Sequence, residues 1–490
     1  MTGGTDAGQA NPAPEPVPEQ VTGAIKDIDR RMKPSEFFAA LGEESAAAGP
    51  ATPVVLHPHD QFLRGVDDDI AAIRRERAGA HCPERLFPVR ADMAARGALD
   101  GFRTGDSLGV SSIPRDTPLL VIGDTHGDAW SLAAALRLAR EPELLHQIGV
   151  LPKVVLPAVV MLGDLVDRGH DHVECAMLAT RRVRSYPQCT IWIAGNHDIG
   201  HRWSEDDGRF VSELAPAEFA DWLNAGDPAE RGWRIEFGKA FLDYVNGLPR
   251  AVAFQCGLLA THGGVPHCDI FHTFRSLEAL KQSSAAKDDF TWIRVAEKAP
   301  VKYPNRSRRG CEIGTEQLVA SVAHISGLLE REGHPRITAV VRGHDHHDDR
   351  YFVHRAGFPS MSLLTVNTMG AGDECSNPFL AGDLDPCVVV YVAGSAPRIV
   401  KLVHPARKSS EDTGEAAGTA PPEAVAPADA AAERDPAAVV QPASDQQSTP
   451  PADPKPAAAT GTPDDEESGD EAPEVSDAKL SIMIRWFRIR

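Results

Sequence analysis

Three stretches of the chain join a short apolar run directly to a polar turn: LLVIGDTHG at residues 119–127, AVVMLGDLVDRG at 158–169 and IWIAGNHD at 191–198. Apolar runs of this length that end in Gly, Asp or Asn are typical of buried β-strands. Helix-type patterns separate the runs, as in AWSLAAALRLAR at residues 129–140. The alternation predicts an α/β domain with polar loops at the strand ends.

The same pattern returns further along the chain, in GLLATHGG at residues 257–264 and ITAVVRGHD at 337–345. Two last apolar runs, PCVVVYVAG at 386–394 and PRIVKLV at 397–403, are joined by a short turn and predict a closing hairpin. Five polar clusters therefore follow predicted strands. Open α/β sheets usually gather their ligand-binding groups at this position.

Composition narrows the class of protein. The 490 residues hold 50 Lys and Arg against 70 Asp and Glu, a net charge of −20, which disfavours nucleic acid as a partner. The 8 cysteines form no CxxC pair, which argues against a zinc ribbon and a disulfide scaffold. The first residues lack a signal-peptide pattern, and no apolar run is long enough to span a bilayer. The expected location is the cytoplasm.

Shifts in composition divide the chain into five predicted segments. They are a disordered leader at 1–22, a helical lead-in or cap at 23–116, the α/β domain at 117–405, an acidic Ala/Pro-rich disordered tail at 406–478 and a basic-aromatic terminal peptide at 479–490.

The two terminal segments carry opposite charge. The tail holds 17 acidic and 4 basic side chains, and we interpret it as a solvated spacer rather than an autoinhibitory or recruiting element. The terminal peptide KLSIMIRWFRIR mixes basic and aromatic residues. It either docks on the chain's own domain or binds a protein partner or an anionic membrane surface.

The five polar clusters combine carboxylates, imidazoles, an amide and guanidiniums, with a glycine beside nearly every one. Mixed imidazole and carboxylate ligands suit zinc, manganese or iron. A carboxylate with two oxygens can bridge two metal ions, and Asp164 is the natural candidate. The glycines allow loops from separate strands to approach one another closely.

The order of the clusters resembles the phosphoprotein phosphatase type of the calcineurin-like metallophosphoesterases, whose signature runs GDxHG, GDxxDRG, GNH[ED], HGG and a late RxH. The resemblance covers residues 117–403. It extends to the approach to HGG, which carries Phe241, Asp243, Asn246, Leu248, Pro249 and Ala251. It implies a β-sandwich of two mixed sheets flanked by helices.

The resemblance also implies a centre of two divalent metal ions, with manganese expected and iron or zinc as alternatives. The first ion is assigned to Asp124, His126 and Asp164, and the second to Asp164, Asn196, His262 and His344. A hydroxide bridging the ions would attack phosphorus in line with the leaving oxygen, without a phosphoenzyme. His346 and His347 follow the last ligand closely, and we expect them to lie outside the ligand set.

By the same resemblance, His197 is the general acid that protonates the leaving group, and Asp167 orients its imidazole. Phosphate binding is assigned to Arg168, Asn196 and a second arginine. Arg309 is the choice for that second clamp, with Arg308 as its alternative.

Two segments depart from the protein-phosphatase branch. Its LWSDP motif is represented only by TWIRV around Trp292, so its acidic group is absent, and its SAPNY motif is matched only loosely by LLTVNTMG at residues 363–370.

The predicted activity is that of a serine/threonine phosphatase-like phosphoric monoester hydrolase, acting on a phosphoprotein or a phosphorylated small molecule. Hydrolysis of a nucleotide polyphosphate such as diadenosine tetraphosphate is the alternative within the same class. A non-catalytic, metal-bound binding protein with a recruiting tail is the alternative from another class.

Overall fold

The computed structural model of the protein describes residues 52–79, 97–267, 274–296, 303–304, 310–354, 361–370 and 385–403. The predicted leader at 1–22, the acidic tail at 406–478 and the terminal peptide at 479–490 lie outside these ranges. Within them, no helix is both long and apolar enough to cross a bilayer.

The first of two six-stranded sheets is built around three parallel strands that precede the first three polar clusters. In spatial order its strands are β1 (Val54–Leu56), β17 (Arg398–Leu402), β16 (Cys387–Tyr391), β3 (Leu119–Ile122), β4 (Ala158–Met161) and β5 (Thr190–Trp192). Strands β3, β4 and β5 run parallel. Strand β16 is antiparallel to both β3 and β17, which confirms the predicted closing hairpin and makes the sheet mixed.

The second sheet carries the strands that precede the last two polar clusters. Its order is β14 (Tyr351–His354), β15 (Ser362–Val366), β13 (Ala339–Arg342), β9 (Leu258–Thr261), β8 (Ala251–Ala253) and β2 (Leu108–Val110). Strands β9, β13 and β15 are parallel, whereas β8 and β14 run against their neighbours β9 and β15. This sheet is therefore mixed as well.

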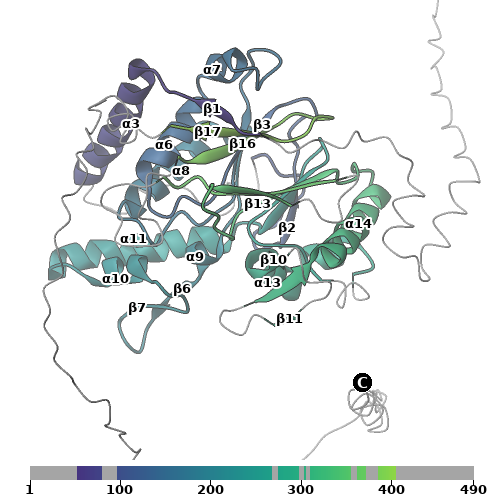
Figure 1. Cartoon of the computed structure of the whole chain (residues 1–490). Coiled ribbons are helices and arrows are strands. Elements are labelled where there is room, and N and C mark those ends of the chain that lie inside the picture. The colour runs from purple at the N-terminus through teal and green to yellow at the C-terminus, as the bar shows by residue number, and fades with distance from the viewer. Residues whose placement is uncertain are drawn as a thin grey trace, which may run out of the picture. The chain divides into compact units, whose positions relative to one another are not determined.

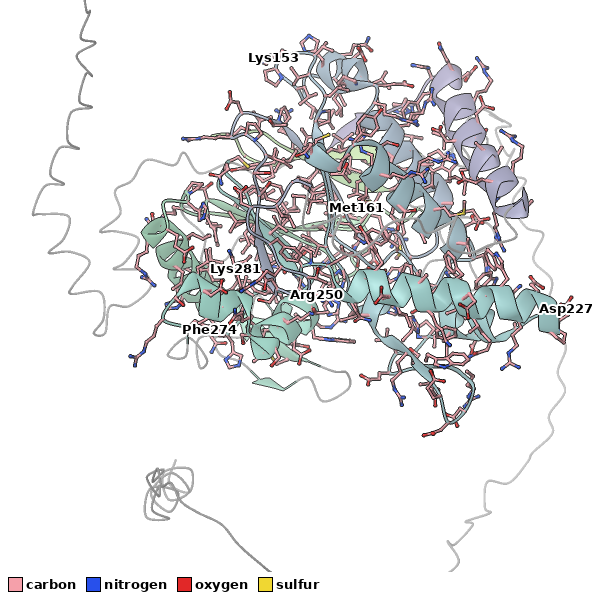
Figure 2. All side chains as sticks on the ribbon, turned by 180° about the vertical axis from the view of Figure 1, so that it is seen from behind. Lys153, Met161, Asp227, Arg250, Phe274 and Lys281 are labelled. Atoms are coloured by element: carbon pink, nitrogen blue, oxygen red, sulfur yellow. The ribbon has the colours of Figure 1, made fainter. Side chains whose placement is uncertain are left out.

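The two sheets pack face to face, and period-2 alternation along each strand decides which side chains lie between them. In β3, Leu119 and Val121 enter the core between the sheets, while Leu120 and Ile122 face the helices outside the first sheet. Figure 2 shows Met161 of β4 in the interior, whereas Lys153 and Asp227 lie at the periphery. The predicted β-sandwich is confirmed.

Helices cover both outer faces of the sandwich (Figure 1). On the first sheet they include α3 (Asp60–Gly79), α6 (Ala129–Leu138), α8 (His172–Ser185), α10 (Glu218–Asn224) and α11 (Pro228–Asn246). On the second sheet they are α12 (Leu277–Lys281), α13 (Ser284–Trp292) and α14 (Thr315–Arg331). Shorter helices are α7 (Pro142–Gln147), α9 (Asn196–Ile199) and the 3-10 helix η1 (Pro187–Cys189).

Two smaller sheets lie outside the sandwich. One has the order β10 (Arg294–Ala296), β12 (Cys311–Gly314) and β11 (Tyr303–Pro304). The other is an antiparallel pair, β6 (His201–Ser204) and β7 (Arg209–Ser212). This pair precedes helices α10 and α11 in the chain.

The predicted helical lead-in at 23–116 differs from its described part. Strand β1 pairs with β17 and strand β2 pairs with β8, so this segment supplies an edge strand to each large sheet. Helix α3 packs on α6 and α8, where Arg77 forms an ion pair of 2.8 Å with the buried Glu174. The segment is therefore part of the sandwich and not an appended cap.

Replacing Phe62 with alanine tests this integration. Its side chain on α3 is fully buried in the core outside the first sheet, so Phe62→Ala should lower the free energy of unfolding by about 3–5 kcal/mol. Thermal or urea unfolding measures the change. The control is Val55→Ala, because the Val55 side chain on β1 is 46% exposed and its loss should cost much less. Equal stability of the two variants would contradict the assignment of α3 to the cooperative unit.

Candidate metal centre and active site

The predicted ligands come from both sheets and meet where their strands end. Asp124 and Asp164 follow β3 and β4, and Asn196 opens α9 shortly after β5. His262 and His344 follow β9 and β13 of the second sheet. All five side chains are buried, so the sandwich encloses carboxylates and imidazoles that would lose hydration energy unless something compensates them.

One group of ligand atoms converges on the amide of Asn196. Its Oδ1 lies 2.8 Å from His262 Nε2 and 2.7 Å from His344 Nδ1. His262 Nδ1 lies 2.9 Å from the Leu162 carbonyl, to which it can only donate, so a neutral His262 points its Nε2 lone pair at Asn196. Two acceptors that face each other at this distance require a proton or a cation between them. Asp164 Oδ2 completes the group at 3.4 Å from His262 Nε2.

A second group surrounds His126. Its Nδ1 lies 2.9 Å from the Val166 carbonyl, and its Nε2 is 3.6 Å from Asp164 Oδ2. Burial and the nearby Arg168 hold the pKa of His126 well below its usual range, so the ring is neutral and presents a lone pair at Nε2. A backbone partner on the other ring nitrogen is the usual way in which proteins fix a metal-binding histidine.

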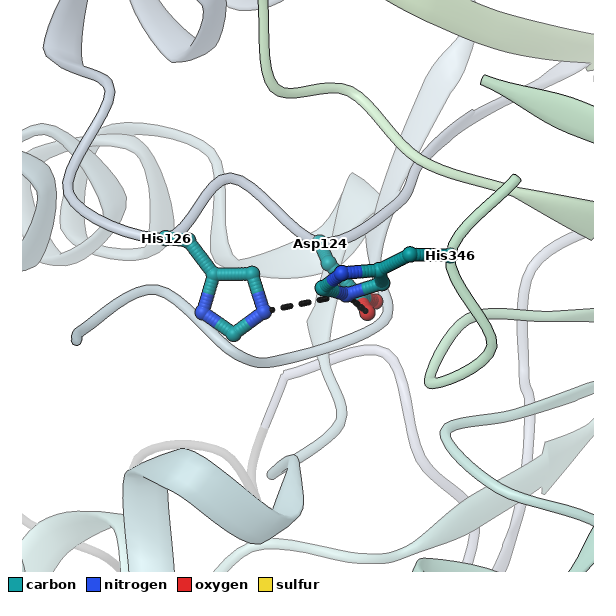
Figure 3. A group of neighbouring side chains, drawn as sticks. All are labelled: Asp124, His126 and His346. Atoms are coloured by element: carbon teal, nitrogen blue, oxygen red, sulfur yellow. Dashed lines mark hydrogen bonds and ion pairs between the residues drawn. The ribbon is translucent and has the colours of Figure 1, made fainter. Parts of the chain in front are cut away.

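His346 joins this second group, although the sequence places it outside the ligand set. His346 Nε2 lies 3.1 Å from Asp124 Oδ2 and 3.2 Å from His126 Nε2, and Figure 3 shows the three side chains together. The available signal was the spacing of His344 and His346, two residues apart after a strand. His347 stays apart, since its ring stacks on Phe352 with the centroids 4.6 Å apart.

The donor set fits divalent metal ions. Burial raises the pKa of Asp124 to about 7, against the opposing effect of His262. Burial alone would lower the pKa of His262, but Asp164 and Asp124 raise it to about 9. Among the described residues, Asp124 Oδ1 is buried without a hydrogen-bond partner. Cations would relieve this crowding of buried carboxylates, and imidazole and carboxylate are ligands that such ions accept.

Asp198, the last residue of the GNHD cluster, ties the loops of the centre together. Its carboxylate accepts hydrogen bonds of 2.9 Å from the backbone N–H groups of Asp164, Leu165 and Gly195. The side chain is fully buried, and both of its oxygens take part in these hydrogen bonds. Asp198 therefore has a structural role: it links the loop of the second polar cluster to the loop of the third.

Backbone strain is concentrated in the same loops. Several non-glycine residues of the clusters adopt positive φ: His126 at 45°, Asp164 at 52°, Asp167 at 66°, Arg168 at 68° and His344 at 70°. Each such conformation costs on the order of 1 kcal/mol, and residues held this way cluster at functional sites. The fold therefore tolerates a loss of stability at these residues, and the strained backbone orients their side chains toward the site.

The predicted acid pair lies beside the ligands. His197 Nδ1 is 2.6 Å from Asp167 Oδ2, and both side chains are buried. The His197 backbone N–H donates to Asp164 Oδ1 at 2.8 Å, which connects the pair to the centre. Burial would raise the pKa of Asp167, but hydrogen bonds from His197 and His201 hold it well below its usual range. An ionised Asp167 therefore accepts a hydrogen bond from the Nδ1–H group of His197. The other ring nitrogen, Nε2, is then the one that can exchange a proton with a substrate.

Arg168 reaches the centre from the same loop as Asp167. Its Nη1 donates to His346 Nδ1 at 2.8 Å, and its backbone N–H donates to Glu218 at the start of α10. The second predicted clamp, Arg309, and its alternative Arg308 lie outside the described residues. The TWIRV segment places Arg294 beside Asp345, to which it donates.

Residues 117–348 match the family model of the calcineurin-like phosphoesterases. The chain therefore contains a segment of the calcineurin-like phosphoesterase type at these residues. The predicted resemblance is confirmed for these residues. Among curated proteins, a segment of 171 residues is 24% identical to the serine/threonine-protein phosphatase PP2A-like PPG1 of Candida albicans. A segment of 92 residues is 30% identical to the serine/threonine-protein phosphatase 6 catalytic subunit of Caenorhabditis elegans.

These matches cover limited parts of both partners. The first spans 35% of this chain and 35% of the relative, and the second spans 19% of this chain and 24% of the relative. A solved protein serine/threonine phosphatase from Saccharomyces cerevisiae, with similarity to human phosphatase PP5, aligns at 19% identity over 69% of this chain and 91% of its own, with a TM-score of 0.40.

Metal removal should destabilise the phosphoesterase more at about pH 8 than at about pH 5. In the metal-free fold the pKa of Asp124 is raised from 3.8 to about 7 and that of Asp198 to about 6, so stability falls as pH rises from about 4 to 7. The raised pKa of His262 stabilises fully below 6.5, and this contribution is lost as pH rises through about 9. All three shifts act in the same direction.

The measurement is the melting temperature with chelator and with manganese at both pH values. Bound cations compensate the ionised carboxylates, so the stabilisation by metal should be larger at the higher pH. An equal metal-induced shift at both values would contradict the assignment of these buried groups to the metal centre.

Proposed function

We propose that the protein is a metal-dependent phosphomonoesterase that hydrolyses phosphoserine and phosphothreonine. The observation that carries the proposal is the buried Asp167–His197 pair, held at 2.6 Å directly beside two converging groups of metal-ligating atoms. A metal centre flanked by a positioned acid is what cleavage of a phosphate ester needs. The serine/threonine phosphatase names of the two relatives support the substrate class.

Two divalent cations, manganese being our choice and iron or zinc the alternatives, fit the donor set. Asp124, His126, Asp164 and His346 would hold one ion, and Asp164, Asn196, His262 and His344 the other. Bound there, they would polarise the phosphoryl oxygens and lower the pKa of an attacking water.

His197 is placed to protonate the leaving oxygen. Because the Nδ1–H group of His197 donates a hydrogen bond to Asp167, Nε2 is the nitrogen available to exchange a proton with the substrate. The carboxylate of Asp167 fixes the ring orientation and favours the protonated imidazole. An alkyl leaving group such as serine depends on this proton, because an unprotonated alkoxide is a poor leaving group.

Arg168 and Asn196 are the phosphate-binding groups on the described part of the chain. A guanidinium can donate to two phosphate oxygens at once through its planar fork. Asn196 turns Oδ1 toward His262 and His344, so its amide nitrogen remains as a donor.

Arg294 supports a second candidate, hydrolysis of a nucleotide polyphosphate such as diadenosine tetraphosphate. It stands in the segment where the protein-phosphatase branch carries an acidic residue, so the site has gained a cation there. With Arg342 it forms two ion pairs to the single carboxylate of Asp345. A surplus of positive charge next to His344 would favour a substrate with more than one phosphate.

Metal-stripped protein re-supplied with manganese, iron, zinc or magnesium separates these candidates. We expect manganese to restore phosphate release from a phosphothreonine peptide and from p-nitrophenyl phosphate, because the donor set mixes imidazole with carboxylate. Cleavage of diadenosine tetraphosphate without peptide hydrolysis would move the function to nucleotide hydrolysis. Metal binding without turnover of any of these substrates would favour a binding protein.

The acid role of His197 is tested by His197→Asn. Asparagine can keep the donor to Asp167 near the position of Nδ1 but has no equivalent of Nε2, so kcat on the phosphopeptide should fall by about a hundredfold or more with bound metal unchanged. The control is His146→Asn, at an exposed histidine of α7. Unaltered turnover in His197→Asn would remove this residue from the role.

A further inference from the structure

Asp167 receives more hydrogen bonds than an acid–carboxylate pair requires. Besides His197, the His201 ring donates from Nε2 to the same oxygen, Oδ2, at 3.0 Å. The backbone N–H of Phe219 donates to the other oxygen, Oδ1, at 2.8 Å. Both oxygens of the carboxylate are therefore fixed, and its rotation about the terminal torsion is blocked from two sides.

The His201 side chain makes no other hydrogen bond among the described residues. Its side chain is fully buried, and its remaining ring nitrogen, Nδ1, is buried without a hydrogen-bond partner there. The ring packs edge-on against Phe219, with the centroids 5.5 Å apart and the planes at 76°. A buried imidazole with a single polar contact is costly to keep for stability alone, and that contact is with Asp167.

The two extra donors enter from outside the catalytic loops. His201 begins β6 and Phe219 lies in α10, so both belong to the stretch that follows the GNHD cluster. Phe219 is anchored by an aromatic cluster that links α10 to α11 and comprises Trp222, Trp233, Phe237 and Phe241. This packing fixes the donors relative to Asp167.

We propose that His201 is a positioning residue for phosphoryl transfer, which holds the Asp167 carboxylate in the rotamer that aims His197 at the leaving oxygen. The inference rests on the proposed function, in which His197 is the general acid. Without His201, Asp167 Oδ2 would keep only the bond from His197, and the Phe219 bond to Oδ1 would have to hold the carboxylate with one restraint fewer. When the general acid is misaligned, the rate of hydrolysis falls most for the esters whose leaving group most needs a proton.

The test compares two aryl esters in manganese-loaded full-length protein. p-Nitrophenyl phosphate releases a weakly basic phenolate that leaves without much help, whereas phenyl phosphate releases a more basic one. The variants are His201→Leu, which removes the donor, and His201→Gln, whose amide nitrogen can donate from nearly the same position as Nε2. The readout is kcat for each ester and the ratio between the two.

His172→Leu is the matched control. His172 is also buried and packs edge-on against Phe219 at 5.4 Å, but it makes no hydrogen bond to Asp167. The ratio of two rates in one sample does not depend on how much of the protein is folded. It therefore separates loss of positioning from loss of active protein.

We expect His201→Leu to lower kcat on phenyl phosphate by about tenfold more than on p-nitrophenyl phosphate, with bound manganese and KM little changed. His201→Gln should restore most of the wild-type ratio, and His172→Leu should leave it unaltered. A wild-type ratio in His201→Leu, or a Gln variant no better than the Leu variant, would overturn the inference. A wild-type protein inactive on both esters with manganese would overturn the proposed function and the inference with it.

Discussion

The close approach of two backbone turns is the constraint on which the rest of the site depends. A Cβ on Gly163 would lie 2.2 Å from the Gly195 nitrogen, and a Cβ on Gly195 would lie 2.1 Å from Asp164 Oδ1. Only glycine permits that contact, and Asp198 then fastens the two turns with three hydrogen bonds. The positions of Asp164, Asn196 and His197 all follow from this junction.

A second constraint links phosphate binding to metal binding. An arginine can only donate, so His346 Nδ1 must accept from Arg168, and its Nε2 then carries a proton toward Asp124 and His126. A cation held through Nε2 would need the lone pair of that nitrogen, so the one proton of the neutral ring would have to reside on Nδ1, which could then no longer accept from Arg168. The position of the Arg168 side chain therefore depends on His346, and the proton position on His346 depends on whether a metal ion is bound.

Local signals predict much of this fold and of the site. The apolar run of β3 and the closing hairpin were readable because adjacent residues carry them, and the order of five motifs predicts which polar side chains converge. The pairing of β1 with β17, by contrast, joins residues almost 350 positions apart and leaves no local pattern. His346 and His201 were missed for a similar reason, since their partners Asp124 and Asp167 meet them only through the fold.

Pairing between the two ends of the described chain also sets where the domain can be cut. The family match at 117–348 leaves out β1, β2, β14, β15, β16 and β17, although β16 lies between β3 and β17 within the first sheet. A fragment with those limits would leave the apolar strand β3 as an unpaired edge and open the core between the sheets to water. Such an edge recruits strands from other molecules, so the fragment would associate with itself instead of folding alone.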